Sequence, residues 1–221
     1  MKKITNYKKI SSLLILVSIF YFLVSNSGNA QTLPEFMLTW KAGNYAPSDY
    51  QGKTLPTDGT KVDVALELID GGRLADLSTT KVRWLVNRKL SASGSGLKNF
   101  SFTVDRFRGD HAVEVTLVDY KGQNLTKRIV IPVVSPEVAI GGGPNVFRAL
   151  LYFFNIQNLS QMKITWSANG NEAGGSVENP DILNLDTTGV PSGTEINLEL
   201  TVQNLLKPIE TATKSIRFVK Q

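Results

Sequence analysis

Apolar and polar residues alternate along most of the chain from residue 35 onward. Val62, Val64, Leu66 and Leu68, for example, are separated by polar or small residues. Because successive side chains of a strand point to opposite faces, this period of two predicts strands with one face on a core. Such strands are expected near residues 61–68, 81–86, 99–104, 111–118, 129–133, 146–154, 161–166, 195–202 and 216–218.

No stretch after residue 35 keeps apolar residues at helical spacing for three turns. The segment 74–78 is too short for a helix. The segment 147–154 is interpreted as a buried strand because it is aromatic and follows a run of glycines. Short strands with turn residues about every ten positions predict an all-β sandwich or barrel.

An internal repeat predicts that the unit is duplicated. Lys81–Asn87 matches Lys163–Asn169 at an offset of 82 residues, and Thr126–Ile131 matches Thr213–Phe218 at an offset of 87. One loop insertion would explain the difference. We therefore expect two tandem domains, residues 31–136 and 137–221. Pro132 and Pro136 restrict the backbone between them, which favours a semi-rigid rod.

Residues 1–30 have the layout of a secretory signal peptide. Four lysines precede an apolar run, Leu13–Val24, and Gly28 and Ala30 occupy the −3 and −1 positions before a cut at Gln31. The run is shorter than the roughly 20 residues of a typical membrane span. Cleavage is the first interpretation and an uncleaved anchor formed by residues 10–24 is the alternative. Either one predicts an exported protein, in the extracellular space, on the cell surface or in a periplasm-like space.

Charge and cysteine content narrow the function further. Four lysines of the leader supply most of the net charge of +5, so the remainder carries only +1. This balance predicts no nucleic-acid partner, and membrane contact only through an uncleaved leader. The chain has no cysteine, which excludes disulfides, thiolate metal sites and cysteine nucleophiles.

Trp84 and Trp166 lie in the middle of matching strands, and both are expected to be structural core residues. In this the chain resembles immunoglobulin-type sandwiches, which bury a tryptophan on one strand against the opposite sheet. The segment Gly109–Asp119 is similar to a strand of immunoglobulin-like and polycystic-kidney-disease-type domains. The whole chain resembles secreted tandem immunoglobulin-like proteins of candidate-phylum bacteria. It departs from polycystic-kidney-disease-type domains at Leu85–Asn87, where those domains have an acidic glycine turn after the tryptophan. The resemblance implies a structural or binding module without catalytic activity or cofactor.

Residues that could carry chemistry are scattered. His111 is the only histidine, so a hydrolytic triad or a histidine metal site has no second partner in the sequence. Aspartates stand singly at predicted turns, where their side chains favour turn formation over calcium binding. We assign no catalytic, cofactor-binding or metal-binding residue. An enzyme of unrecognised type would need two carboxylates within about 10 Å of each other in a cleft.

The loop Gly43–Gly59 is longer than most connections, and long loops are often functional. Its Tyr45 and Tyr50 are candidates for contacting a protein or a sugar ring. The alternative is that both tyrosines cover the end of a sandwich. We therefore expect a non-catalytic envelope or cell-surface module that acts in binding, in adhesion or as a structural spacer. Carbohydrate binding through Tyr45 and Tyr50 is the alternative function, and the expected partner is a protein or a glycan.

Overall fold

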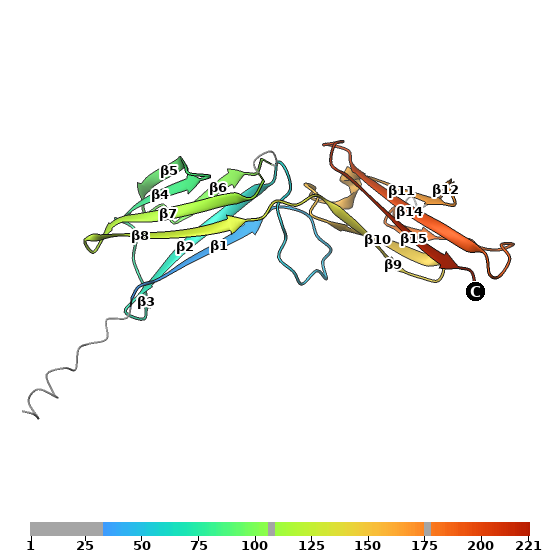
Figure 1. The fold of residues 1–221 in the computed structure, drawn as a ribbon, viewed down its shortest axis with the longest axis horizontal. Coiled ribbons are helices and arrows are strands. Elements are labelled where there is room, and N and C mark those ends of the chain that lie inside the picture. The colour runs from blue at the N-terminus through green and yellow to red at the C-terminus, as the bar shows by residue number, and fades with distance from the viewer. Residues whose placement is uncertain (1–32, 106–108, 175–177) are drawn as a thin grey trace, which may run out of the picture. The chain divides into compact units, whose positions relative to one another are not determined.

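The computed structural model describes residues 33–105, 109–174 and 178–221. The proposed leader lies outside these residues. The described chain is all β, as the alternation predicted, with one 3-10 turn at Leu159–Gln161 and no α-helix (Figure 1). The strands are β1 (Glu35–Ala42), β2 (Lys61–Asp70), β3 (Arg73–Leu74), β4 (Lys81–Val86), β5 (Lys89–Ser95), β6 (Asn99–Thr103), β7 (His111–Tyr120), β8 (Gln123–Ile131), β9 (Glu137–Gly142), β10 (Val146–Tyr152), β11 (Met162–Ala168), β12 (Asn171–Ala173), β13 (Ile182–Asn184), β14 (Glu195–Asn204) and β15 (Thr211–Val219).

The packing of the backbone divides the chain into two compact units. The described part of the smaller unit is 33–36 with 68–75, and the larger unit is 37–67 with the rest of the chain from 76. In the smaller unit, the end of β2 pairs with β3, with Ile69 opposite Leu74. The turn between them consists of Gly71 and Gly72, both at positive φ, a conformation that glycine adopts without steric cost. All contacts discussed below lie within the larger unit.

Two sheets pack face to face in the first sandwich. One has the strand order β5-β4-β7-β8, and the other contains β2 paired with β6. Trp84 on β4 stacks on Phe100 of β6 with ring centroids 5.5 Å apart, and Phe102 of β6 stacks on His111 of β7 at 5.6 Å. These contacts join the inner faces of the sheets, where burial supplies most of the stabilisation. Other buried side chains of this core are Val62, Val64, Leu66, Leu77, Val82, Val104, Val113, Val115, Leu117 and Ile131.

The second sandwich repeats this architecture. Its sheets have the orders β13-β10-β9 and β12-β11-β14-β15. Trp166 lies in one core cluster with residues of both sheets, and the rings of Phe147 and Phe218 meet across the sheets at 5.2 Å. The buried members of the cluster are Val138, Phe147, Ala149, Leu151, Phe154, Ile156, Met162, Trp166, Leu183, Leu198, Leu200 and Val202. The fold is therefore two immunoglobulin-like sandwiches in tandem, and their exact boundary at residues 136 and 137 stays a prediction.

In both sandwiches, the turn that follows the strand with the buried tryptophan has the same conformation and the same hydrogen bonds. Asn87 and Asn169 each have a φ of +51°, and each binds a residue of the neighbouring strand twice. The Asn87 amide N–H donates to Ala112 O, while its Oδ1 accepts from Ala112 N–H. Asn169 makes the same two bonds with Asn197. Asparagine tolerates this left-handed conformation better than most residues, which explains why it recurs.

The equivalent hydrogen bonds of the two sandwiches show that one insertion does not account for the difference between the two sequence offsets. Ala112 corresponds to Asn197, an offset of 85 residues, between the offsets of 82 and 87 found in the sequence. Equivalent threonine pairs, Thr116–Thr126 and Thr201–Thr213, place the remaining change in the last hairpin. The five residues were therefore gained in two places, three before β14 and two between β14 and β15. Register, which the side-chain period does not reveal, is needed to separate them.

The β9–β10 turn requires glycine at position 142. Gly142 has a φ of +94°, and a Cβ atom there would lie 2.3 Å from the Val146 carbonyl oxygen. We expect Gly142→Ala to destabilise the protein by more than the ~1–2 kcal/mol that a left-handed L-residue costs. Gly170→Ala is the matched control, because Gly170 has a φ of +81° and open space around it. Urea unfolding of both variants gives the comparison, and equal losses would contradict the steric explanation.

Candidate functional site

The loop Gly43–Gly59 contacts the second sandwich. Tyr45 forms an isolated antiparallel bridge with Phe154, just past β10 of the second sandwich. The Tyr45 N–H donates to Phe154 O, and the Phe153 N–H donates to Tyr45 O, both at 2.8 Å. The long loop of the first sandwich therefore pairs with backbone of the second.

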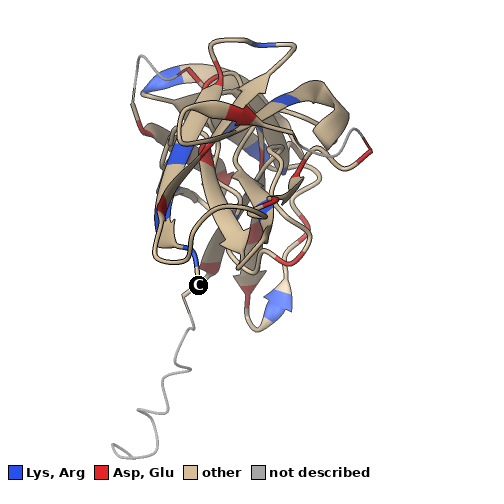
Figure 2. Ribbon diagram, turned by 90° about the vertical axis from the view of Figure 1, so that its right-hand side faces the viewer, with Lys and Arg blue, Asp and Glu red and all other residues tan. Residues whose placement is uncertain are grey.

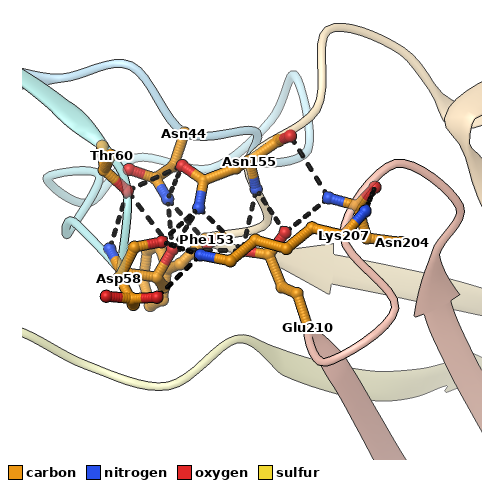
Figure 3. A network of polar contacts seen from close by, with 9 residues as sticks. Asn44, Asp58, Thr60, Phe153, Asn155, Asn204, Lys207 and Glu210 are labelled. Atoms are coloured by element: carbon orange, nitrogen blue, oxygen red, sulfur yellow. Dashed lines mark hydrogen bonds and ion pairs between the residues drawn. The ribbon is translucent and has the colours of Figure 1, made fainter.

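Asn155 and Glu210 form the centre of a polar network beside this bridge (Figure 3). The Asn155 backbone N–H donates to both Glu210 carboxylate oxygens, at 3.1 and 3.2 Å. The Asn155 Nδ2 also donates to Glu210 Oε1, at 2.9 Å. Asn204 Nδ2 donates to the other carboxylate oxygen, Oε2. These residues come from the end of β10 and from the β14–β15 hairpin, so they organise one end of the second sandwich.

The first sandwich contributes further groups to the same network through its long loop. Thr57 Oγ1 donates to Glu210 Oε1 at 3.2 Å and accepts from Asn155 Nδ2 at 2.9 Å. Thr60 Oγ1 donates to Asn155 Oδ1 at 2.7 Å. Asn44 Nδ2 donates to Phe153 O at 2.7 Å. Every one of these bonds spans at least 95 residues of sequence.

An ion pair lies at the edge of the network. Lys207 Nζ is 2.8 Å from Asp58 Oδ2 and also donates to Asp58 O at 2.6 Å. Both side chains are about one third exposed, so solvent screens the pair and it contributes little alone. We call the contacts of Asn44, Thr57, Asp58 and Thr60 with Phe153, Asn155, Lys207 and Glu210 the polar joint.

Because the centre of the polar joint is buried, loss of one of its hydrogen bonds costs stability. Glu210 is only 5% exposed, and Thr57, Thr60 and Asn204 are buried as well. A buried carboxylate is strongly unfavourable unless donors replace its water, and here backbone, amide and hydroxyl groups do so. Hydrogen bonds to a charged acceptor are about twice as strong as neutral ones. The loop 43–60 therefore supplies part of the solvation that Glu210 needs.

A cleft of about 250 Å³ adjoins the polar joint, and both Asp58 and Glu210 line it. Both carboxylates are already bound, Glu210 by the network and Asp58 by Lys207. Such saturated contacts favour a structural role for the two acids over general acid–base chemistry, which requires a group that can reach a substrate proton.

Tyr45 and Tyr50 are both half-buried beside the second sandwich. Tyr45 packs against the second core, and this burial, together with the charge of Asp181, raises the pKa of its hydroxyl. Tyr50 meets Tyr152 and Phe153 edge-on, with ring centroids 5.5 and 5.9 Å apart. Both tyrosines thus contact residues of the second sandwich that follow or end β10. A ligand role for them stays a prediction.

His111 is buried and its ring is bound on both sides. Its Nδ1 lies 2.9 Å from Gly109 O, and its Nε2 accepts from the Asp105 N–H at 3.4 Å. With these partners, Nδ1–H donates to the Gly109 carbonyl and Nε2 is the acceptor. Together with the stacking on Phe102, this arrangement supports a structural role for the histidine.

The three tryptophans differ in their surroundings. Trp84 and Trp166 are fully buried, and their Nε1–H groups donate to the carbonyls of Leu97 and Pro180. Trp40 is half-buried, and Lys53 Nζ lies 3.7 Å above its ring. Burial lowers the pKa of Lys53. The cation–π contact holds the long loop at a second position, in addition to the bridge at Tyr45.

Charged residues of both signs are interspersed over the described ribbon (Figure 2). Within residues 33–105, 109–174 and 178–221, no three His, Asp or Glu side chains gather as metal ligands would. Over the same ranges, no helix has the length and apolar character to cross a membrane.

No family model matches the chain, and no curated protein matches it. Among solved structures, fibronectin(III)-like modules of Clostridium thermocellum CbhA match 84% of this chain and 95% of theirs, at 13% identity and a TM-score of 0.30. Three N-terminal domains of the bacteriophage RB49 outer capsid protein Hoc match 85% and 70%, at 11% identity and a TM-score of 0.34. Bacteroides ovatus SGBP-B, solved with a mixed-linkage heptasaccharide, matches 83% and 46%, at 15% identity and a TM-score of 0.28. Scores this low carry no argument about family or ligand.

The polar joint can be tested at its central residue. Asn155→Asp replaces the amide donor with a second carboxylate beside buried Glu210, so we expect a loss of about 3 kcal/mol or more in the free energy of unfolding. Asn171→Asp makes the same change at an exposed position on β12 and is expected to cost little. Urea unfolding followed by tryptophan fluorescence measures both variants, and equal stabilities would show that Glu210 does not depend on Asn155.

Proposed function

We propose that the chain is a non-catalytic, exported spacer module whose two sandwiches are held together by the polar joint. The observation that carries this proposal is that buried Glu210 and half-buried Asn155 are hydrogen-bonded to each other and to loop 43–60. Buried hydrogen-bonded groups favour one arrangement because any other leaves donors and a charge unpaired. A spacer needs that property, since it must present its ends at a constant geometry.

The distribution of polar groups supports a spacer over a ligand-binding role for the long loop. Thr57 and Thr60, its buried polar residues, turn toward Asn155 and Glu210, and Tyr45 packs on the second core. Partners would then bind elsewhere on the two sandwiches. Immunoglobulin-like sandwiches commonly carry function on loops at their ends, with the sheets as a rigid frame.

Nuclear magnetic resonance distinguishes a fixed spacer from two loosely linked domains. In the wild-type protein we expect amides of both sandwiches to share one alignment tensor and one rotational correlation time. The double variant Thr57→Val, Lys207→Ala removes contacts that cross the polar joint and leaves the Asn155–Glu210 bonds intact. The Tyr45–Phe154 bridge and the Thr60–Asn155 bond remain in this variant, so we expect its two sandwiches to move more relative to each other than in the wild-type protein, without separating fully.

The matched control for this experiment is Thr126→Val, Lys127→Ala, the same two changes on exposed positions of β8. It is expected to tumble as the wild-type protein does. Independent tumbling of the sandwiches in the wild-type protein would refute the spacer proposal.

Export is tested separately, by mass spectrometry of protein produced in an export-competent host. The leader predicts a mature N-terminus at Gln31. An intact Met1 in a membrane fraction would favour the anchor, and an intact Met1 in the cytosol would contradict export.

A further inference from the structure

In each sandwich, the four-stranded sheet ends in a long strand that pairs on one side. In the described part of the chain, β8 pairs with β7 and β15 pairs with β14, and both β8 and β15 have nine residues. The opposite edges of the two sheets are less regular, because β12 has three residues and the pairing of β5 shifts register opposite Trp84 and Leu85. Within these two sheets, β8 and β15 therefore offer the longest regular rows of backbone donors and acceptors to a strand of another chain.

A lysine interrupts the apolar, core-facing side of β8. Lys127 lies opposite Val115, which is fully buried, so the two side chains share the face of the sheet that covers the core. Lys127 itself is exposed, because a long aliphatic stem can carry an ammonium group from such a position out to solvent. The other residues of β8 on this face are apolar, namely Leu125, Ile129 and Ile131.

The second sandwich has a lysine at the same place. Lys214 of β15 lies opposite fully buried Leu200, and its neighbours on that face are Ala212 and Ile216. Lys214 is exposed as well. The internal repeat makes it the equivalent of Lys127, at the offset of 87 residues. Both sandwiches thus have a charge at one position where the alternation of the strand calls for an apolar residue, and we call these two residues the edge lysines.

A charge at this position opposes the addition of another strand. A strand that paired with β8 would extend the sheet, and its own side chains would enclose the Lys127 ammonium group on the core-facing side. A charge that loses its water without gaining a partner is strongly unfavourable. With an apolar residue at position 127, the segment Leu125–Ile131 would alternate without interruption beside an open edge, which is a pattern typical of strands that aggregate.

We propose that the edge lysines prevent β8 and β15 from pairing with strands of a second copy of the chain. A second copy is opposed most directly at β8, because Lys127 is the middle residue of that strand. Antiparallel pairing of two β8 edges about their centres would place the two Lys127 side chains opposite each other on one face, and like charges in that position are destabilising. This inference goes beyond the spacer proposal and does not depend on whether the two sandwiches of one copy tumble together.

Sedimentation velocity of the purified exported protein tests this proposal, from about 10 μM to about 1 mM, the range in which weak contacts are populated. The double variant Lys127→Ile, Lys214→Ile should associate at least about tenfold more tightly than the wild-type protein, because pairing no longer encloses a charge. The matched control is Arg128→Ile, Arg217→Ile, which removes the same charge and adds the same side chain on the same two strands. Both arginines lie on the outer faces of their sheets, opposite Glu114 and Asn197, so the control should sediment as the wild-type protein does.

Amide hydrogen exchange locates the contact in the associated variant. We expect amides of β8 and β15 to exchange more slowly in the assembly than in the wild-type protein, because their free edges become paired. Lys127→Met, Lys214→Met keeps the length of the side chains without their charge and should associate in the same way, and circular dichroism checks the fold of every variant. The proposal is overturned if folded isoleucine and methionine variants sediment as the wild-type protein does, or if the arginine control associates equally. New protection confined to strands other than β8 and β15 would overturn it as well.

Discussion

A buried carboxylate is the constraint around which one end of the second sandwich is organised. The carboxyl group of Glu210 is buried among hydrogen-bond donors, and some of these donors belong to another part of the chain. Asn155 supplies a backbone and a side-chain donor, and Thr57 supplies a hydroxyl. The same arrangement shapes the β14–β15 hairpin, whose Lys207 reaches Asp58. The ordering of a surface loop is thereby coupled to the solvation of one charge.

The two sandwiches share the features that build their cores and corners. They differ in two connections, and these two connections form the polar joint. Both sandwiches keep a buried tryptophan, an asparagine corner and a threonine pair across the last hairpin. The first sandwich has an 18-residue connection, 43–60, where the second has a tight glycine turn. The second has the hairpin 205–210 where the first has only Lys121 and Gly122. The two elongated connections are the ones that meet.

Much of the framework could be predicted from local pattern alone. Alternating residues such as Val62, Val64 and Leu66 indicated strands because side-chain direction follows directly from backbone geometry. The repeat around Trp84 and Trp166 indicated duplication, and both side chains are buried. What the pattern lacked was register: the five extra residues looked like one insertion and proved to be two. The joint was not predictable for a related reason. Asn44, Thr57, Asn155 and Glu210 are ordinary polar residues far apart in sequence, and only folding brings them together. The unusual length of loop 43–59 was the one local sign of it.

Because these two connections differ in length between the sandwiches, the order of the two sandwiches along the chain matters. The long loop belongs to the first sandwich and the long hairpin to the second, so the two sandwiches are not interchangeable. Exchanging their order would place the two-residue turn Lys121–Gly122 opposite the short turn after β9, with neither Glu210 nor Thr57 at the seam.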